Sequence, residues 1–208
     1  MTDFVCITSE RDVLEETIAA WGSCTFLTSN SSIKDIDSVV RKQAPRALIV
    51  SGCKHILPEV IFSRQLTLNL HPSLLPYGRG PVPHIWTIVE RTGIGVSLHA
   101  VDRSIDGGPI VAQRPVPIDY DAHTLTSAFE LLRIHGALLL SENMSKIYSG
   151  KLTTAPQVGP SSRHTLRDQR CIQDIVDDNL KIPLSKLVPL IESRVHDCGI
   201  RTNVPNVT

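Results

Sequence analysis

Asn69 and His71, an asparagine and a histidine two positions apart, open the segment of the sequence best suited to chemistry. Asn69 lies at the end of the short apolar run 66–70, which is typical of a buried strand, and His71 follows directly after this run. Pro72 and Pro76 stiffen the loop that comes next. Side chains two residues apart in an extended chain point to the same side. An amide and an imidazole directed at one point can stabilise a carbonyl oxygen that becomes negatively charged. The structural alternative is that the pair only bonds a turn and lines a polar rim.

A second segment, residues 99–109, carries two acids and ends in the turn Gly107-Gly108-Pro109. Glycine permits a positive φ and lets the backbone approach a ligand closely. Asp106, beside this turn, is placed to accept a proton or to fix the charge state of a histidine. The alternative is that Asp102 and Asp106 are solvated loop acids, or that they form an Asx turn.

The elements that must position these residues alternate along the chain. Short apolar runs predict strands at 4–8, 24–28, 47–51, 66–70, 95–101 and 110–118, and amphipathic periodicity predicts helices at 10–21, 33–43, 85–91 and 125–147. This order indicates an α/β fold, Rossmann-like, with a mostly parallel central sheet flanked by helices. Ligands bind beyond the carboxyl ends of such strands, which is where Asn69 and His71 are expected.

We expect two parts in the chain, a catalytic domain over residues 1–155 and a short C-terminal extension over 156–208. The extension is punctuated by Pro and Ser, and it has two helical patches, at 171–177 and 184–195. These helices would either pack on the domain or join two subunits as a homodimer.

The composition excludes several classes of protein. The chain has 21 basic and 21 acidic side chains, so its charge gives no case for nucleic acid as the main partner. No stretch approaches the roughly 18 apolar residues that span a membrane, and the start does not resemble a signal peptide. The five cysteines include no C-x-x-C pair, which predicts reduced thiols in a cytoplasmic protein rather than disulfides or a metal site.

Together the two segments resemble the signature of the folate-dependent formyltransferases. This family includes the glycinamide ribonucleotide, methionyl-tRNA and sugar N-formyltransferases. Its patterns N-x-H-x-S-x-L-P and G-V-x-x-H-x-V-D-x-x-x-D-x-G-x-I are matched by Asn69, His71, Ser73, Leu75, Pro76, Gly95, Val96, His99, Val101, Asp102, Asp106, Gly108 and Ile110. The loop Tyr77-Gly78-Arg79-Gly80 also resembles the family's R/G-rich loop, and the likeness covers about residues 1–155.

The resemblance implies N10-formyltetrahydrofolate as formyl donor, with its formyl carbon attacked by an amine. Asn69 and protonated His71 would stabilise the oxyanion, while Asp106 would keep His71 charged and help to move the amine's proton. The pterin would enter beside the strand at 47–51. The residues expected around it are Val50, Ser51, Gly52, Ile56, Leu75, Val101 and Asp102, for which ordinary core is the alternative at the apolar positions. No metal is expected, because no histidines show metal-ligand spacing such as H-E-x-x-H.

The amine is expected to belong to a nucleotide-linked amino sugar. Residues 8–12 are acidic and lack the glycines of a phosphate loop, and the stretch after 151 is expected to be too short for a tRNA-binding barrel. Pro83-His84-Ile85-Trp86 resembles the P-x-x-W of the small sugar N-formyltransferases, which act in polysaccharide synthesis, and residues 162–168 loosely resemble their Y-H-R-x-x-D patch. The expected substrate contacts are Tyr77, Arg79, Gly80, His84 and Trp86. Trp86 has core packing as its alternative.

Other functions stay open at this point. The acceptor amine could instead be a purine precursor, an amino acid or a peptidyl amine. A hydrolase would give the formyl group to water, although the catalytic segments begin too early for the extra N-terminal domain of such enzymes. A non-catalytic protein on this fold would be expected to have lost Asn69, His71 or Asp106, and all three are present.

Overall fold

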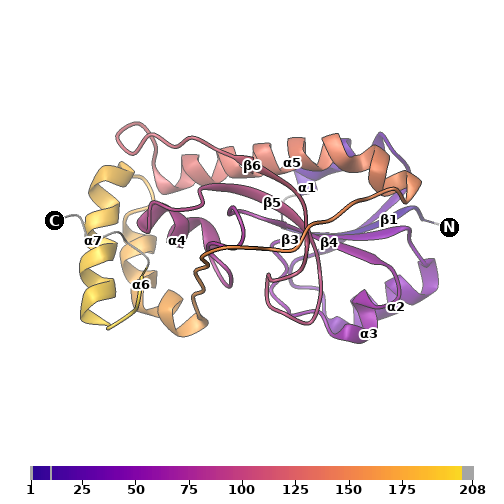
Figure 1. Cartoon of the computed structure of the whole chain (residues 1–208), viewed down its shortest axis with the longest axis horizontal. Coiled ribbons are helices and arrows are strands. Elements are labelled where there is room, and N and C mark those ends of the chain that lie inside the picture. The colour runs from indigo at the N-terminus through magenta and orange to yellow at the C-terminus, as the bar shows by residue number, and fades with distance from the viewer. Residues whose placement is uncertain (1, 10, 203–208) are drawn as a thin grey trace.

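One six-stranded sheet organises the computed structural model, which describes residues 2–9 and 11–202 (Figure 1). The strands are β1 Phe4–Thr8, β2 Cys24–Thr28, β3 Ala47–Ser51, β4 Leu66–His71, β5 Gly95–Ala100 and β6 Ile110–Pro115. Their order is β2-β1-β3-β4-β5-β6; the first four run parallel, and β5 and β6 are added antiparallel. The mostly parallel Rossmann-like sheet is therefore confirmed, with an antiparallel pair at one edge.

Helices cover both faces of this sheet. They are α1 Arg11–Ala19, α2 Ile33–Gln43, α3 Glu59–Phe62, α4 Pro83–Val89, α5 Leu125–Ser149, α6 Leu166–Asp178 and α7 Leu184–Asp197. Figure 1 shows α1 and α5 on one side and α2 and α3 on the other. The short helix α3 was not predicted, since four residues carry too little periodicity. The first residue of the predicted helix at 10–21, Glu10, lies outside the described residues.

The central strand β1 shows how the two layers are held. Successive side chains of a strand point to opposite faces, so Phe4 and Cys6 pack with α1 and α5 while Val5 and Ile7 pack with α2. All four are completely buried. Burying a side chain of this size contributes about 1.5–3 kcal/mol. A polar substitution in β1 would therefore loosen the layer that its side chain faces.

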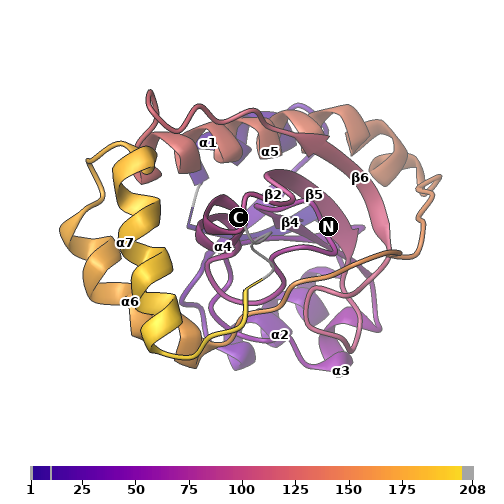
Figure 2. The ribbon, with the colours of Figure 1, turned by 60° about the vertical axis from the view of Figure 1, so that its left-hand side comes forward.

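The C-terminal helices form a second core with α4. The predicted helices at 171–177 and 184–195 lie within α6 and α7, which stand beside α4 in both ribbon views (Figures 1 and 2). The buried apolar residues of this core are Ile85, Trp86, Ile88, Val89, Leu125, Ala128, Ile172, Val176, Leu184, Leu187, Val188, Ile191 and Val195. Thr165 and Asp168 form a capping box that fixes the start of α6.

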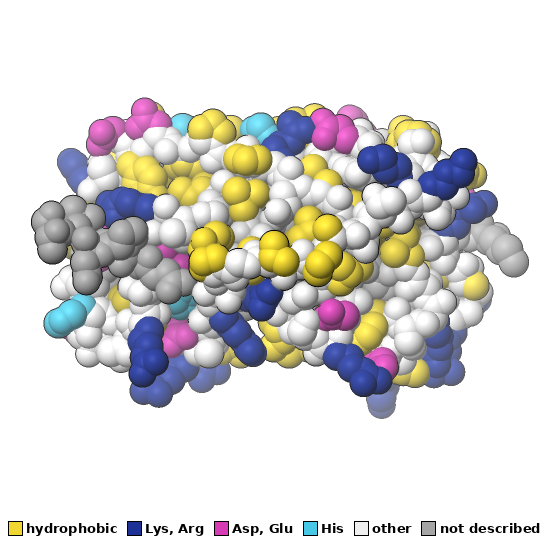
Figure 3. All heavy atoms as spheres, viewed as in Figure 1, with side chains coloured by type: hydrophobic (Ala, Val, Ile, Leu, Met, Phe, Trp, Pro, Cys, Tyr) yellow, Lys and Arg dark blue, Asp and Glu magenta, His cyan; other side chains and the backbone are white. Residues whose placement is uncertain are grey.

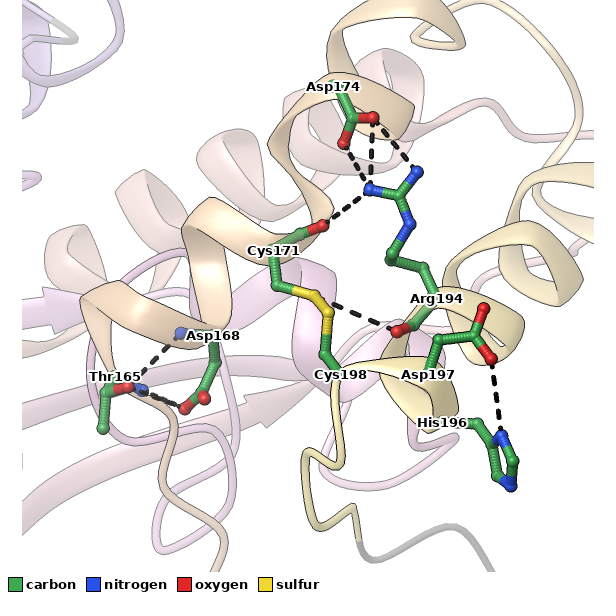
Figure 4. Close-up of a disulfide and its surroundings, with 8 residues drawn as sticks. All are labelled: Thr165, Asp168, Cys171, Asp174, Arg194, His196, Asp197 and Cys198. Atoms are coloured by element: carbon green, nitrogen blue, oxygen red, sulfur yellow. Dashed lines mark hydrogen bonds and ion pairs between the residues drawn. A yellow bond between two sulfur atoms is a disulfide. The ribbon is translucent and has the colours of Figure 1, made fainter.

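One prediction about the cysteines is wrong. Cys171 on α6 and Cys198, which follows α7, form a disulfide across the helix pair (Figure 4). The sequence spacing of 27 residues gave no hint of it, because α6 and α7 fold back on each other and bring distant positions to a Cα–Cα distance of 6.8 Å. Cys24 and Cys53 remain thiols as predicted, and burial raises the pKa of Cys24 to about 12.

Within the described part of the chain, none of the helices combines the length and apolar character that crossing a membrane requires.

Candidate active site

Strand pairing places two polar side chains next to each other in the middle of the sheet. Asn69 on β4 lies opposite His99 on the antiparallel strand β5, and Asn69 Nδ2 is 3.2 Å from His99 Nε2. The pairing of β5 with β6 shifts register between Leu98 and His99, a type of irregularity that redirects side chains near functional sites. Strand β4 continues to His71, so Asn69 projects from within the strand and not from its last residue.

Backbone carbonyls fix the proton positions of both histidines. His99 Nδ1 lies 2.9 Å from the carbonyl oxygen of Ala100, so it carries the proton, and Nε2 can accept from the Asn69 amide. His71 Nε2 likewise donates to the carbonyl oxygen of Gly78 at 2.9 Å. This leaves His71 Nδ1 facing Asp106, whose Oδ1 is 3.7 Å away. The two histidines and the acid therefore converge through atoms whose protonation can change.

Asp106 reaches this position through an uncommon backbone conformation. Its φ is 49°, in the left-handed region that costs a non-glycine residue about 1–2 kcal/mol. The Oδ2 oxygen accepts a hydrogen bond from the Gly80 N–H at 2.9 Å, and Oδ1 lies 3.9 Å from His99 Nε2. The Asp106 side chain is 18% exposed, so the carboxylate can meet a ligand from solvent.

His99 is neutral at ordinary pH. Burial, and then the nearby charge of His71, lower its pKa to about 4. A neutral imidazole has one unprotonated nitrogen, which can accept a hydrogen bond from the Asn69 amide. This bond uses one of the two amide hydrogens and leaves the other free to be donated elsewhere. The arrangement can therefore direct an amide donor and a histidine–carboxylate pair at one reacting oxygen.

The same three groups meet the distance requirement for a divalent cation. One ligand atom each from His71, His99 and Asp106 lies within 4.8 Å of the others. Sequence spacing missed this grouping because the residues come from β4, β5 and the loop after β5. Two imidazoles and a carboxylate suit a transition metal, and the same set suits proton transfer.

Strand pairing places the predicted folate-binding residues of β3 next to this centre. Val50 is the register partner of Asn69 in the pairing of β3 with β4, and Ser51 and Gly52 continue from that point. Val50 and Ser51 are buried, as is Leu75, whereas Ile56 is 77% exposed. Their contact with folate stays a prediction.

The loop after β5 separates the two acids that the sequence analysis considered together. The Val101 N–H donates to Thr67, which ties the start of the loop to β4. Asp102 accepts from the Ser104 N–H at 2.8 Å in an Asx-type turn, which is the structural alternative for this acid. Only Asp106 turns toward the histidines.

The predicted substrate contacts divide into two groups. Tyr77, Arg79 and Gly80 lie in the loop that contacts His71 and Asp106, and the Gly80 N–H donates to Asp106 directly. Trp86 differs from the prediction: it has no exposed surface, because its ring stacks on His164 at 3.9 Å inside the second core. The structure thus places Trp86 in the core, its stated alternative.

His84 is also turned inward. Its ring lies 4.4 Å from Phe129, and burial, followed by the charge of His71, lowers its pKa to about 4. In this environment it is a neutral histidine and a poor electrostatic partner for a diphosphate.

Three further residues of the site region were not proposed from sequence. His99 was only a motif match, and its role depends on the cross-strand pairing with Asn69. Gln157 binds Arg79 and the backbone of Asp106. His164 fell only within the loosely matched patch 162–168, and it forms a buried hydrogen bond with Glu90. No sequence signal identifies Gln157, because it lies in an irregular segment far from the motifs.

Parts of the sequence are similar to known formyltransferases. Over 118 residues, 55% of this chain, it is 35% identical to a methionyl-tRNA formyltransferase of Thermodesulfovibrio yellowstonii, of which 38% is covered. Over 101 residues, 49% of this chain, it is 32% identical to a dTDP-4-amino-4,6-dideoxyglucose formyltransferase of Mycobacterium bovis, of which 43% is covered. The matches thus span well under two thirds of these curated relatives.

A solved structure extends the similarity over most of the chain. The formyltransferase PseJ from Anoxybacillus kamchatkensis, in complex with UDP-4,6-dideoxy-4-formamido-L-AltNAc and tetrahydrofolate, superposes with a TM-score of 0.77 at 25% identity. The superposition covers 88% of this chain and 96% of PseJ. The family model described as formyl transferase matches residues 9–139, a stretch that contains Asn69, His71, His99 and Asp106. Because that model matches more than half of the sequence, the chain belongs to the formyl transferase family.

Proposed function

We propose that this protein transfers a formyl group from N10-formyltetrahydrofolate to the primary amine of a nucleotide-linked amino sugar. The observation that carries the proposal is the convergence of Asn69, His71 and Asp106 at the end of β4. The similarity to PseJ, which was crystallised with such a sugar nucleotide and tetrahydrofolate, supports the substrate class.

The proposed residue roles follow from the hydrogen bonds. The amine nitrogen forms a bond to the formyl carbon, and the carbonyl oxygen carries negative charge in the tetrahedral intermediate. The bond from that carbon to the donor nitrogen then breaks, and the donor nitrogen leaves with one proton, which balances the proton that the amine loses. Asn69 donates its free N–H to this oxygen, since the other N–H is held by His99. Protonated His71 donates from Nδ1, while its Nε2–H bonds the Gly78 carbonyl oxygen and sets the orientation of the ring. Each such donor is worth about 3–4 kcal/mol in the transition state.

Asp106 is proposed to balance the charge of His71 and to take the proton that the amine loses. Its Oδ1 is too far from His71 Nδ1 for a direct hydrogen bond, at 3.7 Å. Contacts of this kind are often long before substrate binds and close in the complex. The donor supplies the formyl group, and the proposed pterin contacts are Val50, Ser51, Gly52, Ile56, Leu75, Val101 and Asp102, with Ile56 offering an exposed apolar surface.

A second candidate is formylation of an aminoacyl group, favoured by the similarity to methionyl-tRNA formyltransferases. The formal net charge of zero argues against it, because tRNA binding depends on basic surface. Hydrolysis of the donor is a third outcome to be tested. We propose a cytoplasmic location as before, although the disulfide is unusual for that compartment. The division into a catalytic domain over 1–155 and an extension over 156–208, and homodimer formation, also remain proposals.

The test is mass spectrometry of a pool of nucleotide-linked amino sugars incubated with the protein and N10-formyltetrahydrofolate, with an aminoacyl-tRNA in a parallel reaction. A single sugar that gains one formyl mass supports the proposal. Formylation of the tRNA alone favours the second candidate. Donor consumed without a formylated amine indicates hydrolysis, and an unchanged donor with every acceptor contradicts the catalytic roles of Asn69, His71 and Asp106.

A further inference from the structure

The segment between α5 and α6 crosses the molecule beside the catalytic loops, shown in orange in Figure 1. It is fixed at two points. Ala155 exchanges two backbone hydrogen bonds with Ile110, and Arg163 pairs with Arg79 in a parallel bridge. Figure 3, in the same view as Figure 1, shows a row of hydrophobic side chains where this segment crosses the molecule. Between the two fixed points, Val158 is 78% exposed, whereas its neighbour Gln157 is half-buried. An extended chain that is held at both ends alternates in this way, and it turns Gln157 toward the site.

The Gln157 side chain makes all the hydrogen bonds that an amide can make. Its Nε2 donates to the carbonyl oxygens of Asp106 at 2.9 Å and Gly108 at 2.7 Å. Its Oε1 accepts from Arg79 Nε at 3.2 Å and Nη2 at 2.7 Å. An amide has two N–H donors and two lone pairs, so this one is saturated. Gln157 therefore joins the loop that carries Asp106 to the loop that contains Arg79 and Gly80.

These bonds act on one of the four non-glycine residues with a positive φ in the described part of the chain. Asp106 has a φ of 49°, and surrounding contacts help to hold a non-glycine residue in this conformation. The Gly80 N–H donates a hydrogen bond to the Asp106 carboxylate, and Gln157 donates one to the Asp106 carbonyl oxygen. Both the side chain and the backbone of Asp106 are therefore fixed by hydrogen bonds. If the hydrogen bond to the carbonyl oxygen is lost, we expect the turn at 106–108 to change conformation. Asp106 Oδ1 would then move away from His71 Nδ1 and His99 Nε2.

We propose that Gln157 is a positioning residue for the transfer reaction and that it sets the place of the Asp106 carboxylate. This gives the segment after α5 a role in catalysis without contact with substrate. The kinetic consequences of this inference rest on the proposed function. The hydrogen bond from Gln157 that holds Asp106 can be tested independently of activity.

The decisive variant is Gln157→Glu. It has the same shape and keeps an acceptor for Arg79, but it places an oxygen against the two carbonyl oxygens. We expect kcat to fall about 100-fold with both KM values within about threefold, because the bound substrates are unaffected while the proton acceptor is misplaced. Gln157→Ala, which also loses the Arg79 contact, is the second variant. Gln169→Glu is the matched control: this residue lies on α6, and its side-chain amide donates to Gln173 at 3.1 Å, so kcat and both KM values should stay within about twofold of wild type.

The independent readout is hydrogen exchange of the Gly80 amide, which donates to Asp106. We expect it to exchange about tenfold faster in Gln157→Glu and to be unchanged in Gln169→Glu. A kcat within threefold of wild type, or a lower kcat with unchanged Gly80 exchange, would overturn the positioning role. A wild-type protein without transfer activity would contradict the proposed function, and the exchange measurement would still decide whether Gln157 holds Asp106.

Discussion

Among the described residues, two clusters pair a buried histidine with a carboxylate, and they differ in how completely the pair is enclosed. In the first cluster, His71 Nδ1 is 3.7 Å from Asp106 Oδ1, and the acid is 18% exposed. In the second core, His164 Nε2 is 3.0 Å from Glu90 Oε1, and the side chains are only 2% and 1% exposed. The His164 ring is also stacked on Trp86.

This difference in enclosure is the one expected between a site for chemistry and a pair that only stabilises the fold. A pair that is already hydrogen-bonded and sealed from water has no free position for a substrate atom, and its contribution is to stability. The His164–Glu90 pair ties the segment before α6 to the end of α4. The open pair leaves room at His71 Nδ1 and Asp106 Oδ1, which suits transfer of a proton. Residue type alone does not distinguish the two.

The largest effect is expected from Asp106→Asn. Loss of the proton acceptor should lower the transfer rate about 1,000-fold, while the unfolding free energy changes by less than about 1 kcal/mol, because an asparagine oxygen can still accept from Gly80. Steady-state kinetics and urea unfolding measure the two quantities. Asp121→Asn, at an exposed position, is the control. A rate within tenfold of wild type would remove Asp106 from the mechanism.

The opposite result is expected from Glu90→Gln. Removing one member of a buried pair should lower the unfolding free energy by about 3 kcal/mol and leave kcat of the folded protein within about threefold. The control is Glu192→Gln on α7, whose carboxylate pairs with Arg91 at the surface and should contribute less than about 1 kcal/mol. Equal losses of stability in the two variants would show that enclosure does not distinguish the clusters.

Acid should destabilise the protein through its neutral histidines. The pKa values of His99 and His84 are lowered to about 4 by burial, so between the ordinary value of 6.5 and 4 the unfolded state binds more protons than the folded state. Stability therefore falls as pH falls through this window, by about 1–2 kcal/mol per histidine between pH 7 and 5. Urea unfolding across this range should give a flatter profile for His99→Gln. An unchanged profile would mean that His99 is not held neutral.

The smallest effect concerns metal. His71, His99 and Asp106 are close enough to share a cation, but proton transfer by the open pair requires none. Treatment with a chelator should leave the transfer rate within about twofold. If the chelator abolished activity and added zinc restored it, His71, His99 and Asp106 would instead form a metal site.

The regular elements were determined largely by the local sequence. Helix α2 was predicted with its observed bounds, Ile33–Gln43, and α5 begins at Leu125 as predicted. The strands β1, β2 and β3 were also predicted with their observed bounds. Buried apolar runs and helical periodicity are local signals, so no partner is needed to read them. By contrast, the antiparallel direction of β5 and β6 and the disulfide between α6 and α7 depend on how distant segments meet.

The site divides in the same way. The types and spacing of Asn69, His71 and Asp106 were sufficient to propose an oxyanion donor pair and a proton acceptor. Only the tertiary structure decided that His99 is the partner of Asn69 and that Trp86 is core. It alone places Gln157 against Asp106. A residue's type fixes which bonds it can form, but burial and neighbours from remote parts of the chain decide which of them it does form.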